Sequence, residues 1–170
     1  MKKILVAISM LLITVTLSSL TAALATNGPV YIEQRGLWAG KGQGEGSLVG
    51  HVIFELDGTN LIITFETIDD WLLYETHLYL GKTIPTKSAP GRFPYQHDPL
   101  PGVPSDQYTV PLGELSATNG DTLYVAAHAV VHDGDCGEET AWACGGGRFF
   151  NRAGKQQGWA MYSDFVVPEL

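Results

Sequence analysis

Apolar and polar side chains alternate through most of the chain after residue 26, in short runs bounded by glycine, proline and aspartate. A period of two is typical of β-strands with one buried face, whereas an amphipathic helix needs a period near 3.6. We find no convincing helical period. The pattern predicts an all-β fold, a single antiparallel β-sandwich of immunoglobulin-like or jelly-roll type.

The most secure local prediction is a β-hairpin. Residues 48–56 and 60–65 both alternate, and Asp57-Gly58 between them is a common hairpin turn sequence. In this register the side chains of Leu48 and Val52 are expected to face the core together.

Two longer strands are predicted over residues 71–80 and 122–132. In the first, the even-numbered positions, including Leu72, Leu78 and Leu80, form the expected core face. In the second, the odd-numbered and even-numbered positions likewise form two faces. Its central alanines suggest that another part of the fold packs closely against this strand. Shorter strands are expected over residues 30–33, 108–112 and 159–167.

Two segments are too rich in glycine or proline for regular strands. Residues 36–50 contain six glycines, which predict a mobile loop or an irregular edge that carries Trp38. Residues 84–104 contain six prolines, which cannot donate to a ladder. A connection of that length is more often functional than a plain linker. We expect it to pack through its own side chains, notably Phe93, Tyr95 and His97.

The N-terminus has the composition of a secretory signal peptide. Lys2 and Lys3 precede an uncharged apolar run that ends in the A-x-A pattern Ala23-Leu24-Ala25. We therefore expect cleavage after residue 25 and one β-sandwich domain over residues 26–170. The mature protein is then secreted or extracytoplasmic, with no membrane span. An uncleaved anchor is the alternative, because the uncharged stretch is long enough to cross a bilayer.

Charge argues against one class of partner. Without residues 1–25 the chain keeps 18 acidic and 8 basic residues, a formal charge of −10. Nucleic acid is not expected as a partner, because phosphate binding needs clusters of Lys and Arg.

The two cysteines, Cys136 and Cys144, are predicted to form a disulfide, since an exported chain with an even cysteine count usually pairs them. The bond would hold the segment between them in one shape. A structural zinc site is the weaker alternative, because the sequence has no C-x-x-C pair.

Four short segments stand out: Glu75-Thr76-His77-Leu78-Tyr79-Leu80-Gly81, Pro90-Gly91-Arg92-Phe93-Pro94-Tyr95, Ala126-Ala127-His128-Ala129-Val130-Val131 and Glu139-Thr140-Ala141-Trp142. They resemble the landmarks of a family of small domains in secreted and surface proteins of bacteria. The resemblance spans residues 47–162 and implies an exported β-domain, but it supplies no established activity and no catalytic residues. Ala143-Cys144 stands where the family pattern has glycine, which implies that the disulfide is particular to this branch.

Imidazole and carboxylate groups are the first candidate site. Glu75 and His77 share one strand face, and His128 and His132 share another, with Glu139 near them in sequence. If the two strands are neighbours, these groups suit zinc or copper, with each ring oriented by a further partner. The alternative is that the histidines are half-buried and hydrogen-bonded to loop carbonyls.

The acidic segment 133–139 is the second candidate. Its carboxylates offer oxygen ligands of the kind that calcium prefers, and they are Asp133, Asp135, Glu138 and Glu139. The spacing is not that of an EF-hand loop. A solvated acidic turn is the alternative.

Aromatic side chains are the third candidate. Tyr95, Trp38 and Trp142 are expected on loops, where a ring can stack on a sugar or anchor a protein partner. Trp71 and Trp159 fall on predicted strands and are expected to be ordinary core residues.

The sequence lacks the usual motifs of nucleophilic catalysis and phosphate binding. We interpret the chain as a secreted, non-catalytic binding or surface-interaction module for a glycan or a surface protein, with Ca or Zn as candidate metals. Its binding residues are predicted to be Glu75, His77, His128, Tyr95 and Trp142. One alternative is a small metal-dependent enzyme that uses both histidines and a carboxylate, and another is a structural component of an extracellular matrix.

Overall fold

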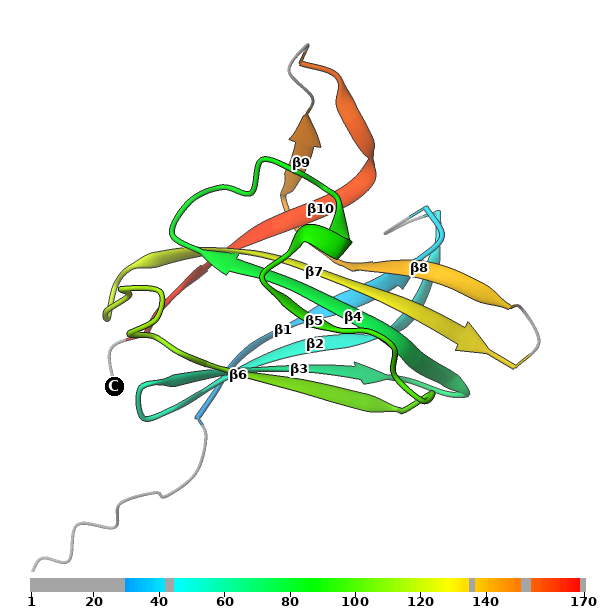
Figure 1. Cartoon of the computed structure of the whole chain (residues 1–170), viewed down its shortest axis with the longest axis horizontal. Helices are drawn as coiled ribbons and strands as arrows, with labels where there is room; N and C mark the ends of the chain where they lie inside the picture. The colour runs from blue at the N-terminus through cyan, green and yellow to red at the C-terminus, as the bar shows by residue number, and fades with distance from the viewer. Residues whose placement is uncertain (1–29, 42–44, 135–136, 151–153, 169–170) are drawn as a thin grey trace, which may run out of the picture.

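The computed structural model describes residues 30–41, 45–134, 137–150 and 154–168 (Figure 1). Within these ranges the chain is all-β, with ten strands and one 3-10 turn. None of the described residues belongs to a helix long and apolar enough to cross a membrane. The predicted signal peptide lies outside the described ranges.

The strands are β1 (Val30–Ala39), β2 (Ser47–Asp57), β3 (Asn60–Thr67), β4 (Trp71–Gly81), β5 (Tyr95–His97), β6 (Ser105–Pro111), β7 (Thr122–Asp133), β8 (Glu138–Ala143), β9 (Gly147–Phe150) and β10 (Gln156–Val166), and the turn η1 (Pro90–Arg92) precedes β5.

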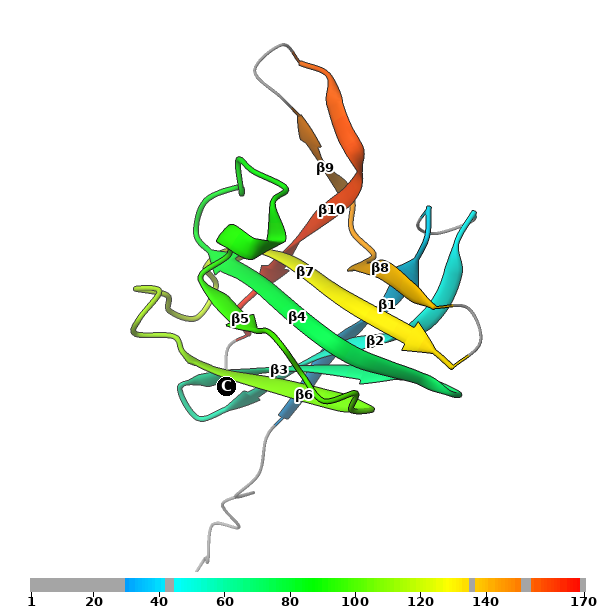
Figure 2. The same ribbon diagram turned by 45° about the vertical axis from the view of Figure 1, so that its right-hand side comes forward.

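Eight strands follow one antiparallel ladder, in the order β5-β4-β7-β8-β1-β2-β3-β6, and β10 pairs with β7 and β9. The sheet curls until it is nearly closed into a barrel (Figure 2). At the seam Leu73 bridges Val103, and the amide of Leu100 donates to the carbonyl of Tyr74 at 2.7 Å. The all-β antiparallel prediction is confirmed. The finer prediction of a two-sheet sandwich is not, because the ladder is continuous.

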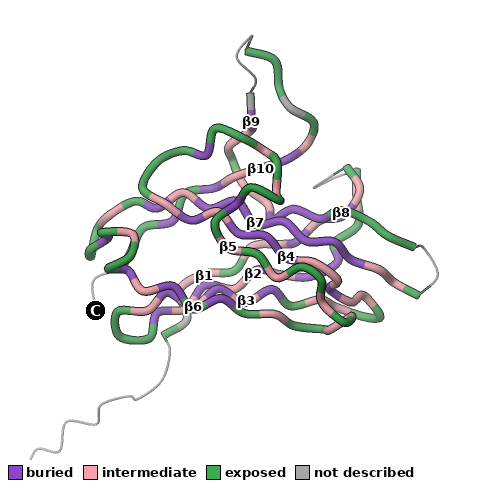
Figure 3. Tube along the Cα trace, in the orientation of Figure 1, coloured by how far each residue is buried: buried purple, intermediate pink, exposed green. Residues whose placement is uncertain are grey.

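The main core fills the inside of the curled sheet, where buried stretches of opposing strands face one another (Figure 3). Strand β7 is buried on both faces along most of its length, and alternate residues point into this core: Leu123, Val125, Ala127, Ala129 and Val131. Phe54 of β2 is fully buried and stacks on Phe165 of β10, with ring centroids 5.7 Å apart. The even-numbered residues of β7, His128 among them, therefore face away from this core.

The predicted hairpin is confirmed as β2–β3. A β-bulge in β2 changes which of its side chains point into the core. In the β1–β2 pairing, Leu37 lies opposite Gly50 and Trp38 lies opposite Leu48, so Val49 is the extra residue. Val49 is fully buried and Leu48 is exposed. The prediction that Leu48 faces the core is wrong, because the bulge inverts the alternation there.

A second irregularity lies in β4. The β4–β7 register shifts between Leu73 and Glu75, so Leu73 is fully buried while Leu72 is only half-buried. Beyond the shift the predicted alternation returns, and Leu78 and Leu80 are buried as expected. The strand thus presents Glu75 and His77 on the face away from the main core.

The segments predicted as irregular contain regular structure. Residues 36–50 hold the end of β1 and the start of β2, and Trp38 lies within β1 rather than on a loop. Residues 84–104 include η1 and the short strand β5, which pairs with β4. Residues 42–44 lie outside the described ranges.

A smaller apolar cluster lies on the outer face of β4, β7 and β8. Its buried members come from the proline-rich segment, from β7 and β8, and from the β9–β10 hairpin: Phe93, Ala126, Trp142, Phe149, Ala160 and Met161. Gly147 packs so closely on Tyr162 that a Cβ there would lie 2.3 Å from the ring. This outer cluster covers the face that carries the histidines.

Candidate metal centre

Two histidines face each other at the centre of the outer face. His77 of β4 lies directly opposite His128 of β7 in the ladder, and their Nδ1 atoms are 3.3 Å apart. Both side chains are buried, at 3% and 5% exposure. The Trp142 indole and the His128 ring form a T-shaped pair, with centroids 4.9 Å apart. The condition that the sequence left open is therefore met, because β4 and β7 are neighbours and bring these two imidazoles together.

Burial keeps both rings neutral. It lowers the pKa of His128 to about 3, with the nearby His77 as the second cause. Burial also lowers the pKa of His77, against a smaller opposing effect of the Asp98 carboxylate. In a pair of neutral rings one Nδ1 donates a hydrogen and the other accepts it. A histidine that donates through Nδ1 keeps the lone pair of Nε2, which is the form that binds metals.

Two carboxylates complete the cluster. Glu75 lies two residues before His77 on the same strand, and Asp98 directly follows β5, which pairs with β4. One ligand atom from each of Glu75, His77 and Asp98 lies within 4.8 Å of the other two. Among the described residues no other group of three or more potential ligands comes so close. Glu75 is half-buried and Asp98 is exposed, so the cluster opens to solvent.

The carboxylates repel each other. The pKa of Glu75 is raised, first by burial and then by the negative charges of Asp98 and Glu138. A divalent cation would relieve this repulsion, because it favours the ionised forms of both carboxylates. One imidazole and two carboxylates are donors that zinc and copper(II) accept, and a fourth position would stay open to water.

Asp98 was not among the residues singled out in the sequence. It lies more than 20 positions from Glu75, in a segment predicted to be irregular. No local signal identifies it, because its place depends on the pairing of β5 with β4. The bend after a short edge strand brings its carboxylate to the histidine.

Two predicted binding residues lie on strands and not on loops. Trp142 was expected on a loop, but it belongs to β8 and is 5% exposed, packed between Phe93 and Phe149. Tyr95 lies in β5 and packs edge-on against Tyr108 beside the main core. Their predicted position on loops is wrong for the same reason, since each joins a strand that local composition did not indicate.

The predicted calcium ligands do not form a described cluster. Asp133 ends β7, whereas Glu138 and Glu139 begin β8 and, as neighbours in a strand, point to opposite faces. Asp135 lies outside the described residues, so the calcium site stays a prediction. Cys136 lies outside them too, and the disulfide with Cys144 likewise stays a prediction.

A second polar network lies on the opposite face of β4, at the seam of the barrel. The hydroxyl of Thr76 donates to Asp106 of β6, whose carboxylate also contacts Nδ1 of His97 at 2.9 Å. The Tyr108 hydroxyl donates to the carbonyl of Thr76, and burial raises its pKa to about 12. The His97 ring stacks on Tyr108, with centroids 4.4 Å apart. This network joins β4, β5 and β6.

Comparison with known proteins adds no relative. No family model matches the chain, and neither the curated proteins nor the solved structures give a match.

Proposed function

We propose that this chain is an exported, non-catalytic binding module whose outer face binds a divalent transition metal, zinc or copper(II). His77, Glu75 and Asp98 are the ligands. His128 accepts a hydrogen bond from His77 and orients its ring. The observation that carries the proposal is the approach of one imidazole and two carboxylates within 4.8 Å, beside a second, neutral imidazole.

The role of His128 follows from its burial. A histidine that binds a metal usually donates its other ring N–H to a fixed partner, which sets the tautomer and the ring orientation. His128 is held between β4 and β8 and packs against Trp142, so its ring has a fixed place. It remains neutral at physiological pH and can accept that hydrogen.

Zinc titration of chelator-treated protein tests the proposal. We expect one equivalent of Zn²⁺ to bind, as measured by competition with a chromophoric chelator, and to raise the melting temperature. His77→Ala and Glu75→Ala should each weaken binding at least about 100-fold. His128→Asn, which acts only through His77, should weaken it about 10-fold.

His51→Gln is the matched control, because His51 is a half-buried histidine on β2, away from the cluster. It should leave zinc affinity unchanged. If wild-type protein takes up no zinc, or if His51→Gln weakens binding as much as His77→Ala, the proposed site is wrong.

A metal-dependent enzyme is the second candidate function, and the exposure of Asp98 favours it. A site with three protein ligands and access to solvent has room for a zinc-bound water, which is the arrangement of catalytic zinc centres. Zinc-loaded protein would then hydrolyse an activated ester such as 4-nitrophenyl acetate faster than the Glu75→Ala variant does. Equal rates of hydrolysis for the two proteins would contradict the enzyme hypothesis and favour the binding module.

Export is part of the proposal and has its own test. The A-x-A pattern supports cleavage after residue 25, and the even cysteine count supports oxidation. Intact mass of secreted protein should correspond to a chain that begins at Thr26 and is two hydrogens lighter than its reduced form. A secreted chain that begins at Met1 would contradict it.

A further inference from the structure

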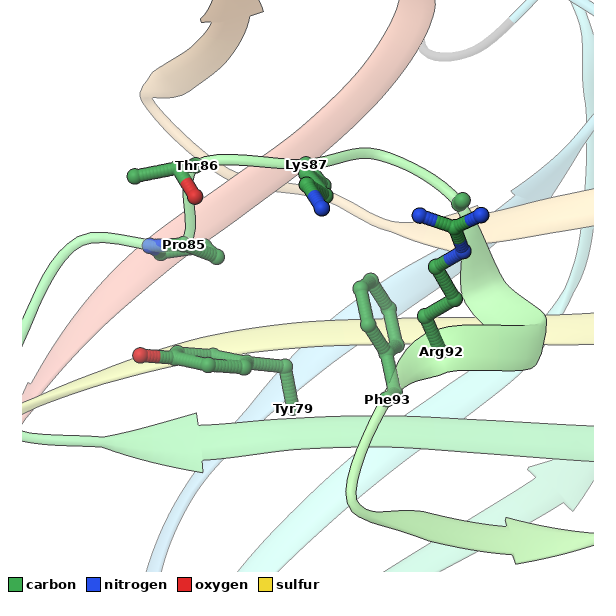
Figure 4. A pocket seen from close by; sticks show the side chains of 7 residues that line it. Tyr79, Pro85, Thr86, Lys87, Arg92 and Phe93 are labelled. Atoms are coloured by element: carbon green, nitrogen blue, oxygen red, sulfur yellow. The ribbon is translucent and has the colours of Figure 1, made fainter.

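A pocket lies on the outer face, separate from the metal centre and further along β4. It has a volume of about 410 Å³ and lies between β4 and the proline-rich segment. Its lining residues include Tyr79, Pro85, Thr86, Lys87, Arg92 and Phe93. Figure 4 shows the Tyr79 ring along its floor, with Lys87 on the loop above and Arg92 rising from η1. A volume of this size is typical of sites for small molecules.

The floor of the pocket is aromatic and held in place. The Tyr79 hydroxyl donates to the carbonyl of Thr83 at 2.8 Å, and its ring makes a T-shaped contact with Phe93, which is buried. The tyrosine ring is therefore fixed with one face towards the pocket. A fixed aromatic face is a surface on which the C–H face of a sugar ring stacks.

The charge of the pocket is opposite to that of the chain. The whole sequence carries a formal charge of −8, yet Lys87 and Arg92 both lie at this one pocket. Two other cations have carboxylate partners, Arg35 with Glu33 at 2.6 Å and Lys82 with Asp121 at 3.0 Å. Within the described residues, neither Lys87 nor Arg92 forms an ion pair. Two exposed cations without a carboxylate partner favour an anionic ligand.

We propose that this pocket binds a uronic acid residue of an acidic polysaccharide. The pyranose ring stacks on Tyr79, and its carboxylate pairs with Arg92 and Lys87. Thr86 offers a hydroxyl to the sugar, and Pro85 supplies apolar contact. The site uses none of the metal ligands, so it is independent of the metal centre.

The probe is a trimer of galacturonic acid, titrated calorimetrically in the presence of a chelator so that no metal can bridge its carboxylates. We expect saturable binding that weakens as salt rises, since the ion pairs at this open pocket are screened. The fully methyl-esterified trimer, which keeps the sugar rings and loses the charges, should bind at least about 10-fold more weakly.

Variants assign the contacts. Arg92→Gln and Lys87→Gln change exposed side chains and should each weaken binding about 10-fold without lowering the melting temperature. Tyr79→Leu should weaken binding about as much while Tyr79→Phe retains it, which separates stacking from the hydroxyl. Lys41→Gln is the charge-matched control, because Lys41 is an exposed lysine outside this pocket. It should bind like wild type.

Four results would overturn the proposal. They are no binding of the trimer at millimolar concentration, equal binding of its methyl ester, an equal loss of affinity in Lys41→Gln, and displacement by acetate or inorganic phosphate at concentrations equal to that of the trimer. The last would show an anion site that does not recognise the sugar.

Discussion

Thr76 and His77 are adjacent in β4, yet they face two different polar networks. At the seam, the donors and acceptors of Thr76, Asp106 and Tyr108 contact one another, so the network holds strands together. On the outer face, carboxylates gather beside His77, and burial, followed by repulsion from Asp98 and Glu138, raises the pKa of Glu75. Polar groups that hydrogen-bond to one another stabilise the fold. Like charges brought together beside a neutral imidazole instead favour the binding of a cation.

Loss of Trp142 should have the largest effect on stability. Its side chain is buried and contacts Phe93, His128 and Phe149, so Trp142→Ala opens a cavity in the outer cluster. We expect a loss of about 3 to 5 kcal/mol in the free energy of unfolding, measured with urea. Phe54→Ala in the main core should cost a similar amount. A loss below about 1 kcal/mol for Trp142→Ala would show that the outer cluster is not a second core.

Acid should destabilise the protein through His128. Its folded pKa of about 3 lies below the unfolded value near 6.5, so the unfolded state binds more protons between these values. The free energy of unfolding is therefore not reduced by His128 above about pH 6.5, where its ring is neutral in both states. It falls as pH drops from 6.5 towards 3. For this group alone, the loss approaches about 1.4 kcal/mol for each pH unit.

Urea unfolding of chelator-treated protein at pH 6.5 and 4.5 measures this slope. His128→Asn has no group that titrates in that interval and should lose less stability on acidification than wild type does. Parallel pH profiles for the two proteins would mean that the acid sensitivity comes from other groups.

A substitution in the polar network at the seam should lower the stability of the fold and leave metal binding unchanged. Thr76→Val keeps the shape of a fully buried side chain and removes the hydroxyl between Asp106 and Tyr108. We expect a loss of about 1 to 2 kcal/mol in unfolding free energy. Zinc affinity should stay within about twofold, because Thr76 points away from His77. A large change in zinc affinity would show that the two faces are coupled.

The smallest change in stability is expected for Glu75→Gln. The side chain is half-buried and its charge is repelled by Asp98, so the variant should unfold within about 0.5 kcal/mol of wild type. Zinc binding should nevertheless be lost. If Glu75→Gln bound zinc like wild type, this carboxylate would not be a ligand.

Much of the strand pattern could be predicted from the sequence. Of the metal ligands, Glu75 and His77 could be predicted, and Asp98 could not. Period-two alternation located the hairpin and both long strands, and it put Glu75 and His77 on one face. The pairing of His77 with His128 was expected only on condition that β4 and β7 are neighbours, because strand order is a non-local property. Asp98 could not be found, since its position depends on an edge strand of three residues.

Bulges and short strands account for the remaining errors. One extra residue at Val49 inverts the alternation around Leu48, and no composition rule marks where such a residue falls. Trp142 was predicted to lie on a loop because glycines surround it in sequence. In three dimensions it pairs with both Trp38 and His128, which makes β8 an interior strand.

The contact between Gly147 and Tyr162 limits the order in which substitutions can accumulate. A methyl group at position 147 would overlap the Tyr162 ring, which packs against Tyr124 and Phe149, so a larger residue there forces the ring out of these contacts unless a smaller side chain has already replaced it. The reverse order passes through a clashing intermediate. The two positions should therefore covary in descendants of this chain, so a laboratory evolution experiment on the β9–β10 hairpin would recover changes at position 162 before changes at position 147.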